Sequence, residues 1–180
     1  MSLSFAVSAD IIKQLFEDDS FVEDYSDKYQ VSSTFCELLL RELGDDERVP
    51  EFEQISRITD VDISPLYQML KYCDEADIES VSRFLQDKTE EERNREIEKL
   101  KSDNAKMLGN IDIVILTLEN LITALSKVGD LAKIVTFHEP DRFLKEYFAD
   151  DSFGQDLRNF KRFAEFAKSK GANTLFYRIN

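Results

Sequence analysis

The chain has 180 residues, of which 42% are hydrophobic and 33% are charged, with only 5 Gly and 3 Pro. So few turn-forming residues leave little material for β-hairpins, which argues against a β-rich fold. The formal net charge of −14 opposes attraction to nucleic acid and to anionic lipid over long range, and it favours a basic protein as the partner.

The negative charge is concentrated in the first two thirds of the chain. Residues 1–129 carry 14 Lys and Arg against 29 Asp and Glu, whereas residues 130–180 carry 9 against 8. Cys36 and Cys73 stand in apolar helical patterns, which is typical of reduced thiols in a cytoplasmic protein. No basic segment followed by a long apolar run opens the chain, and the most apolar stretch, 111–118, is too short to cross a bilayer. We therefore expect no signal peptide and no membrane span.

Apolar residues at helical spacing begin close to the N-terminus. Ser8 is a candidate N-cap for a first helix over 11–16, and Ser32 or Ser33 would cap a second helix that ends at Gly44. Acidic residues gather beside these two helices. Because they cluster, we predict that they contact the basic partner; they are Glu17, Asp18, Asp19, Glu23, Asp24, Asp45, Asp46 and Glu47.

The next segment has the spacing of a short helix, a tight turn and a second helix, with Pro50 and Pro65 near the two helix starts. Over residues 33–86 this pattern resembles the phage-repressor type of helix-turn-helix domain, although that family usually has Gly where Asp60 stands. Residues 51–73 hold two basic side chains against four acidic ones, which is not the basic footprint of a DNA-binding module. The resemblance implies that four side chains face DNA, with Gln68 suited to adenine: Ser64, Tyr67, Gln68 and Lys71.

The longest helical pattern starts at a capping box formed by Thr89 and Glu92. Apolar residues then recur with strict 3-4 spacing over 97–128, and Asn104 is the one polar residue at a core position. This spacing predicts a long central helix over 89–129 with a coiled-coil seam. The seam either packs internally or forms a parallel homodimer in which Asn104 faces its twin; the contact residues would be Ile97, Leu100, Asn104, Met107 and Ile111.

Two further helices are expected after the break at 129–130. One opens at Pro140, and the last, capped by Ser152, carries a stripe of Phe and stops at Gly171; residues 174–177 read as a short extended segment. Residues 16–21 (FEDDSF) and 148–153 (FADDSF) repeat one pattern. The echo indicates one of two things. Either both segments converged on the same residues at the boundary of a helix, or a helical unit was duplicated.

Few residues are candidates for chemistry. His138 precedes a predicted helix, but no nucleophile or second base stands at a spacing that would support catalysis. Cys36, Cys73 and His138 lack metal-ligand spacing, the acidic pairs at 18–19 and 150–151 lack the alternating ligands of a calcium loop, and no glycine-rich phosphate loop is present. We therefore expect no metal, no cofactor and no enzymatic activity.

Together these features predict an all-α, multi-helix bundle. Its expected parts are an acidic N-terminal helical bundle over 1–88, the long central helix over 89–129, and a C-terminal helical pair over 130–180. The expected function is to bind, and to inhibit or neutralise, a basic protein partner, as antitoxins, immunity proteins or antirestriction proteins do, with mimicry of the charge of DNA as one way of doing so. The alternative is a helix-turn-helix transcriptional regulator that dimerises through the long helix.

Overall fold

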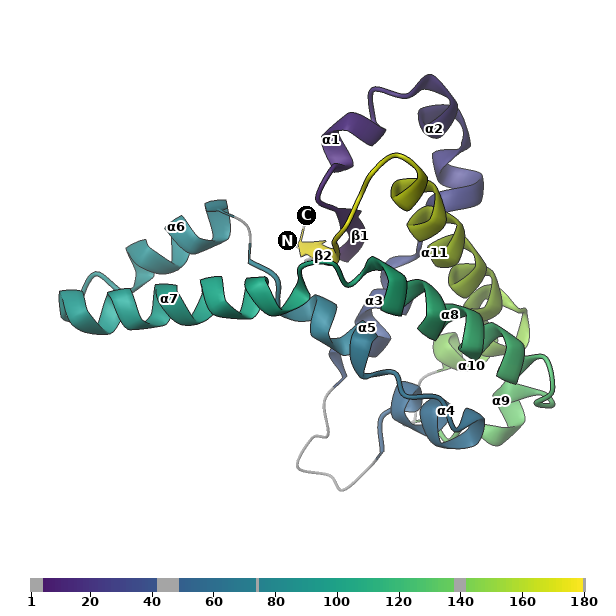
Figure 1. The fold of residues 1–180 in the computed structure, drawn as a ribbon. Helices are drawn as coiled ribbons and strands as arrows, with labels where there is room; N and C mark the ends of the chain where they lie inside the picture. Colours follow the sequence, from purple (N-terminus) through teal and green to yellow (C-terminus); the bar gives the residue numbers. More distant parts are fainter. Residues whose placement is uncertain (1–4, 42–48, 74, 138–141, 180) are drawn as a thin grey trace.

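The computed structural model describes residues 5–41, 49–73, 75–137 and 142–179. Within these ranges the predicted all-α, multi-helix fold is confirmed, and its β-structure is one two-stranded sheet (Figure 1). In chain order the elements are β1 (Phe5–Ala9), α1 (Ile12–Leu15), α2 (Asp19–Asp24), the π-helical turn η1 (Tyr25–Tyr29), α3 (Ser33–Leu40), α4 (Glu51–Thr59), α5 (Ser64–Gln68), the 3₁₀ turn η2 (Met69–Lys71), α6 (Glu75–Phe84), α7 (Glu90–Met107), α8 (Ile111–Leu125), α9 (Leu131–Ile134), α10 (Arg142–Ala149), α11 (Ser152–Ser169) and β2 (Leu175–Ile179).

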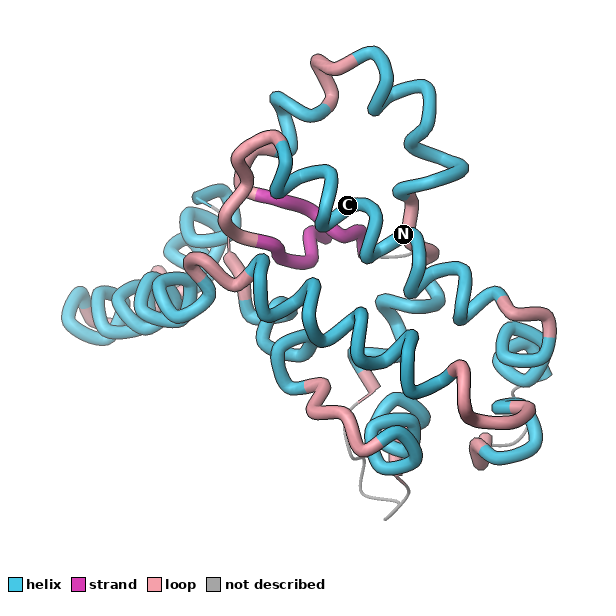
Figure 2. Tube along the Cα trace, turned by 45° about the vertical axis from the view of Figure 1, so that its right-hand side comes forward, coloured by secondary structure: helices cyan, strands magenta, loops and turns pink. Residues whose placement is uncertain are grey.

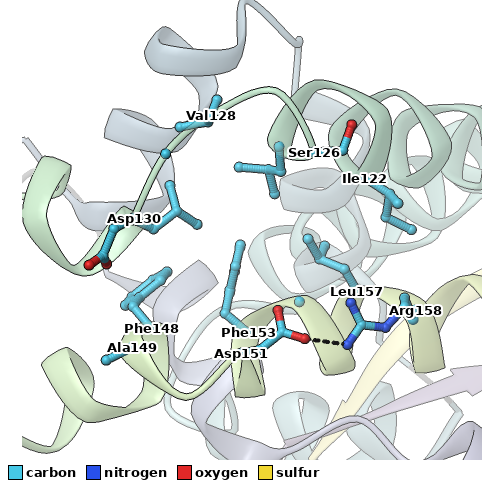
Figure 3. Close-up of a pocket in the computed structure, with 14 residues that line it drawn as sticks. Ile122, Ser126, Val128, Asp130, Phe148, Ala149, Asp151, Phe153, Leu157 and Arg158 are labelled. Atoms are coloured by element: carbon cyan, nitrogen blue, oxygen red, sulfur yellow. Dashed lines mark hydrogen bonds and ion pairs between the residues drawn. The ribbon is translucent and has the colours of Figure 1, made fainter.

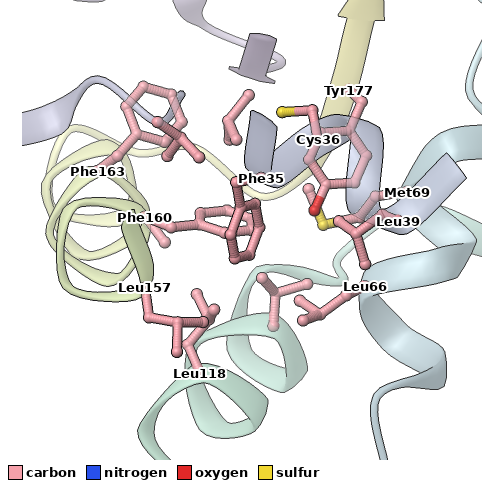
Figure 4. Packing of buried hydrophobic residues seen from close by; sticks show 14 of the residues in the cluster. Phe35, Cys36, Leu39, Leu66, Met69, Leu118, Leu157, Phe160, Phe163 and Tyr177 are labelled. Carbon is pink, nitrogen blue, oxygen red and sulfur yellow. The ribbon is translucent and has the colours of Figure 1, made fainter. Parts of the chain in front are cut away.

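Helices α8 and α11 pack against each other at the centre of the core. Helix α11 buries Phe153, Leu157, Phe160 and Phe163 at intervals of three or four residues, which is the 3.6-residue period of an amphipathic helix. Around it, Phe35 of α3 lies with its ring centroid 5.5 Å from that of Phe52, 5.8 Å from that of Phe153 and 6.0 Å from that of Phe160. Figure 4 shows this packing of Phe35 beside Phe160 and Leu118. The predicted segments 1–88, 89–129 and 130–180 all contribute residues to one hydrophobic cluster.

The sheet joins the two ends of the described chain. β1 and β2 run antiparallel, with Ala9 opposite Leu175 and Ser8 opposite Phe176. The prediction that Ser8 caps a helix is therefore wrong, and the first helix begins at Ile12. Val7, Ser8 and Ala9 are all buried, as in a strand covered on both faces. Their extended conformation depends on pairing with one strand that is far away in the sequence. Of the extended segment predicted at 174–177, residues 175–177 are confirmed as part of β2, which continues to Ile179.

The single central helix predicted over 89–129 is instead two helices, α7 and α8, bent by 61° relative to each other. Gly109 lies between them with φ of +77°, a left-handed conformation that glycine adopts at no steric cost. Its N–H donates to Thr174 Oγ1 at 3.2 Å, and the Asn110 side chain bonds both the N–H and the C=O of Leu175 at 2.8 Å. Contacts with the C-terminal segment fix the bend, and a heptad pattern read along one helix cannot reveal them.

Helices α6 and α7 form a hairpin that projects from the rest of the molecule, and we call residues 75–107 the arm (Figures 1 and 2). The predicted capping box starts its second helix: Thr89 Oγ1 accepts from the N–H of Glu92 at 3.3 Å, and Glu92 Oε2 accepts from the N–H of Thr89 at 3.0 Å. Among the arm side chains that the structure describes, only Met107, at the root, is buried. The arm therefore stands largely outside the hydrophobic core.

The FxDDSF echo marks the starts of α2 and α11, and in each copy the first Asp of the pair accepts from the N–H two residues later. Asp18 accepts from the N–H of Ser20 at 3.1 Å, and Asp150 accepts from the N–H of Ser152 at 3.0 Å. The Phe that follows each Ser is buried, Phe21 at 0% exposure and the second, at 153, at 1%. The two starts differ in their N-caps: Asp18 itself caps α2, whereas α11 follows Asp151, which is left-handed with φ of 66° and makes no side-chain cap bond. The two copies therefore share one hydrogen bond from an amide to an Asp, and they differ in where the helix begins.

Within the described ranges, no helix taken alone is long and apolar enough to cross a bilayer; only the bent pair α7 and α8 meets the length and composition criteria when the two are combined.

Candidate protein-binding surface

The structure gathers five of the eight predicted partner contacts on one exposed feature. Residues 16–24, the turn after α1 together with α2, contain these five acidic residues and no basic residue, and we call them the acidic lobe. The five are Glu17, Asp18, Asp19, Glu23 and Asp24. The other three predicted contacts, Asp45, Asp46 and Glu47, lie outside the described residues.

Two of these five carboxylates already have partners within the chain. Asp18 caps α2 and accepts from Lys170 Nζ at 2.6 Å, which ties the lobe to the C-terminal end of α11. Asp24 accepts from Lys28 Nζ at 2.7 Å, one helical turn away. Their negative charges are thus partly neutralised, so Asp18 and Asp24 contribute to the fold of the lobe more than to the attraction of a partner.

The other three carboxylates of the lobe, Glu17, Asp19 and Glu23, are exposed and form no hydrogen bond or ion pair with the described residues. Asp19 and Glu23 stand four residues apart on α2, so they lie on one face of it. Beside them, Phe16 is 48% exposed and Val22 is 49% exposed. Apolar side chains surrounded by unpaired charges of one sign are typical of a protein-binding surface, because the apolar groups supply affinity and the charges steer association.

Acid should weaken the tie between Asp18 and Lys170. The Lys170 ammonium group holds the pKa of Asp18 well below its ordinary value of 3.8, with a smaller effect from Ser20. A carboxyl whose pKa is lowered on folding stabilises the protein above its unfolded-state pKa, and this stabilisation is lost as the pH falls through the folded-state pKa. We expect Asp18→Asn, which keeps the cap, to lower the melting temperature at pH 7 and to lower it by less as the pH falls below about 4. Thermal melts of both proteins from pH 7 to pH 2.5 measure this difference; a difference that is the same at every pH would contradict the assignment.

The predicted helix-turn-helix segment has the expected turn but a short second helix. Asp60 ends α4 with φ of 54°, so it adopts the left-handed conformation for which the family uses Gly; Asp tolerates this region better than most residues. Helix α5 spans five residues before η2 and packs against α8. Ser64 and Gln68 are exposed, whereas Tyr67 is half-buried with its ring 6.2 Å from that of Phe52. The side chain of the fourth predicted DNA contact, Lys71, lies outside the described set.

The predicted dimer-seam residues make contacts within the chain. Asn104 accepts from the N–H of Cys73 at 3.0 Å and donates to the C=O of Cys73 at 2.6 Å, so its carboxamide joins the arm to the segment after η2. Met107 and Ile111 are buried on either side of the bend, while Ile97 and Leu100 are half-buried along the arm. The dimer stays a prediction, and in it Asn104 would have to exchange these two hydrogen bonds for bonds to its twin.

A cavity of about 420 Å³ lies between the C-terminal end of α8 and the turn from α10 to α11 (Figure 3). Apolar side chains, Phe148, Phe153 and Leu157 among them, form its wall. Its polar lining consists of Ser126, Asp130 and an ion pair of 2.6 Å between Asp151 and Arg158. That pair passes over Gly154, where a Cβ atom would collide with the Asp151 carboxylate.

Among the described residues, no three His, Cys, Asp or Glu side chains are placed to hold a metal ion. Cys36 and Cys73 are both free thiols, and burial raises the pKa of Cys36 to about 12, with a smaller contribution from Asp156. A thiol with so high a pKa is a poor nucleophile at neutral pH. His138 lies outside the described residues.

Comparison of the chain with protein-family models, with curated proteins and with solved structures found no match.

Proposed function

We propose that this chain is a noncatalytic binding protein whose acidic lobe occupies a basic site on another protein and so inhibits or neutralises it. An antitoxin, an immunity protein or an antirestriction protein works in this way, and an acidic surface of this kind can stand in for the charge of DNA. The observation that carries the proposal is the group of three exposed, unpaired carboxylates beside the exposed Phe16 and Val22; these carboxylates are Glu17, Asp19 and Glu23.

The charge of the whole chain supports the same partner. A net charge of −14 creates a field that draws basic surfaces toward the protein and repels nucleic acid. The lobe then supplies the two components of a specific contact, unpaired carboxylates for orientation and apolar side chains for burial.

Pull-down from the native host tests the proposal, with Asp19→Lys/Glu23→Lys as the lobe variant. Glu91→Lys/Glu98→Lys is the matched control, because it changes the charge by the same amount at exposed positions of α7. We expect the unmodified protein and the control to retain a basic protein that the lobe variant releases. If all three proteins retain the same partners, or if the retained partner is acidic, the proposal is wrong.

The second candidate is a DNA-binding regulator, and the left-handed turn at Asp60 favours it. Against it, Asp62 accepts from both the N–H and the hydroxyl of Ser64 at the start of α5, which puts a carboxylate where DNA phosphates would approach. A gel-shift assay with host DNA, run beside the pull-down, separates the two candidates. Retarded DNA without a captured basic protein would favour the regulator.

A further inference from the structure

The cavity between the C-terminal end of α8 and the turn from α10 to α11 has the size of a small-molecule binding site (Figure 3). Its volume of about 420 Å³ falls within the range of roughly 300–1,000 Å³ that such sites occupy. Side chains inside a protein interdigitate and leave few voids larger than a water molecule. A cavity of this volume is therefore space that the side chains of the chain itself leave open.

The wall of the cavity is mainly apolar, and two aromatic rings form part of it. Phe148, Phe153 and Leu157 are buried, and the centroids of the two Phe rings lie 4.8 Å apart. The rest of the apolar wall is half-buried and comes from α8 and the segment after it; its residues are Ile122, Leu125, Val128 and Leu131. Ser126 and Ala149 are exposed at the rim, so the cavity opens to solvent there. Apolar rings that enter it would exchange water for apolar and aromatic contacts, which is favourable.

The described residues that line the cavity include three charged side chains, and each has a partner within the chain. Asp151 Oδ2 accepts from Arg158 at 2.6 Å, and Arg158 also donates to Gln155 Oε1 at 3.0 Å. Asp130 Oδ2 lies 2.9 Å from Lys133 Nζ. A charged ligand would lose hydration on entering and would meet no free counter-charge in return. The lining therefore favours an uncharged ligand.

The pair of Asp151 and Arg158 takes the place of an ordinary helix cap. An Asp that precedes a helix usually accepts from amide groups of the first turn, but Asp151 makes no such bond and pairs with Arg158 one side of the cavity away from the wall formed by α8. Gly154 leaves room for this arrangement, because a Cβ atom there would collide with the Asp151 carboxylate. Figure 3 shows the pair beside Phe153 and Leu157. The two charges that face the cavity are thus held against each other.

One polar group of the lining can still bind a ligand. The Ser126 hydroxyl donates to the C=O of Thr123 at 2.7 Å. A hydroxyl oxygen that donates its proton keeps lone pairs that accept. An N–H or O–H group of a ligand can therefore donate to Ser126 without displacing a bond of the chain.

We propose that this cavity binds a small uncharged molecule with an apolar ring system and one hydrogen-bond donor. The rings would lie against Phe148 and Phe153, and the donor would face Ser126. The proposal does not rest on the acidic lobe, since none of the lobe residues lines the cavity. A bound molecule would contact both α8 and the start of α11, so it would stabilise the folded chain.

The test uses the full chain and two fluorescent probes that share one aromatic frame. Phenylnaphthylamine is uncharged and has one N–H group, and anilinonaphthalene sulfonate is the same frame with a sulfonate group added. Both emit more strongly in apolar surroundings, so titration gives their dissociation constants. We expect the uncharged probe to bind roughly tenfold more tightly than the sulfonate or better, because the sulfonate finds no free cation. The uncharged probe should also raise the melting temperature.

Variants at the rim place the probe. Ala149→Phe and Ser126→Phe add a ring from two different sides, and each should weaken binding of the uncharged probe by roughly tenfold, since the ring occupies its space. Ala105→Phe is the matched control, because it adds the same ring at an exposed position of α7. It should bind the probe as the unmodified protein does.

Asp151→Asn tests the assignment of charge. Asn also tolerates the left-handed conformation, and the change frees Arg158 from its counter-charge. The sulfonate probe should then bind several-fold more tightly, while binding of the uncharged probe stays the same. Binding of the uncharged probe that survives both Ala149→Phe and Ser126→Phe, or that Phe84→Ala abolishes, would overturn the site. So would a sulfonate probe that binds the unmodified protein as tightly as the uncharged one.

Discussion

Replacing Phe35 with Ala should lower the free energy of unfolding by roughly 3–5 kcal/mol, the usual cost of deleting a buried Phe side chain. Phe35 is 0% exposed, and its ring meets rings from α4 and α11, so it holds three helices to one another. Because backbone elements surround it, the cavity left by the ring cannot collapse without moving a helix. Urea denaturation followed by circular dichroism measures the loss.

Phe84→Ala is the matched control for that experiment. The same side chain is deleted at a position that is 87% exposed, where substitutions usually change stability by less than about 0.5 kcal/mol. A loss below about 1 kcal/mol for Phe35→Ala, or equal losses for the two variants, would contradict the position of Phe35 at the junction of α3, α4 and α11.

The second large effect is expected at Asp156, a buried carboxylate on α11. Its Oδ1 accepts from the N–H of Ser32 at 2.9 Å, and its Oδ2 accepts from the Ser32 hydroxyl and the Tyr147 hydroxyl, both at 2.5 Å. Ser32 in turn caps α3, and Tyr147 belongs to α10, so one side chain joins three helices. Burial, and then the Asp156 charge, raise the pKa of Tyr147 far above its ordinary value, so the phenol keeps the proton that it donates.

Asp156→Ala should therefore cost roughly 3–5 kcal/mol, since hydrogen bonds to charged groups contribute more than neutral ones and buried donors are left unpaired. A graded series distinguishes this network from simple packing. Tyr147→Phe removes one of the three bonds and should cost about 1–2 kcal/mol, and Asp156→Asn, which keeps one acceptor, should fall between the two. Equal losses for all three variants in urea denaturation would contradict the network.

Much of the fold follows from local patterns in the sequence. The capping box at Thr89, the Phe stripe of α11 and the extended tail are all visible in residue spacing, because each depends on neighbours within a few positions. The bend at Gly109 and the strand at Ser8 were not predictable in this way. Both are fixed by residues 173–176, more than sixty positions from Gly109 and more than one hundred and sixty from Ser8.

The candidate surface shows the same difference between features set by sequence neighbours and features set by distant residues. Clustering in the sequence places Glu17, Asp19 and Glu23 close together, but it cannot show that Asp18 is engaged by Lys170 at the other end of the chain. Apolar spacing over 11–16 does not reveal which side of a short helix the body covers, so the 48% exposure of Phe16 appears only in the structure. The sequence also does not show that α6 and α7 project from the body, because half-covered and fully covered apolar stripes have the same residue spacing.

The central claim is that unpaired carboxylates of the acidic lobe attract a basic partner. Its most direct test is the association rate of the captured partner, measured by stopped flow as the salt concentration rises, for the unmodified protein and for Asp19→Lys/Glu23→Lys. The claim predicts a rate that falls by roughly tenfold or more between low and physiological salt for the unmodified protein, and a slower, much less salt-dependent rate for the variant. Association that is indifferent to salt, or equally steep in both proteins, would contradict it.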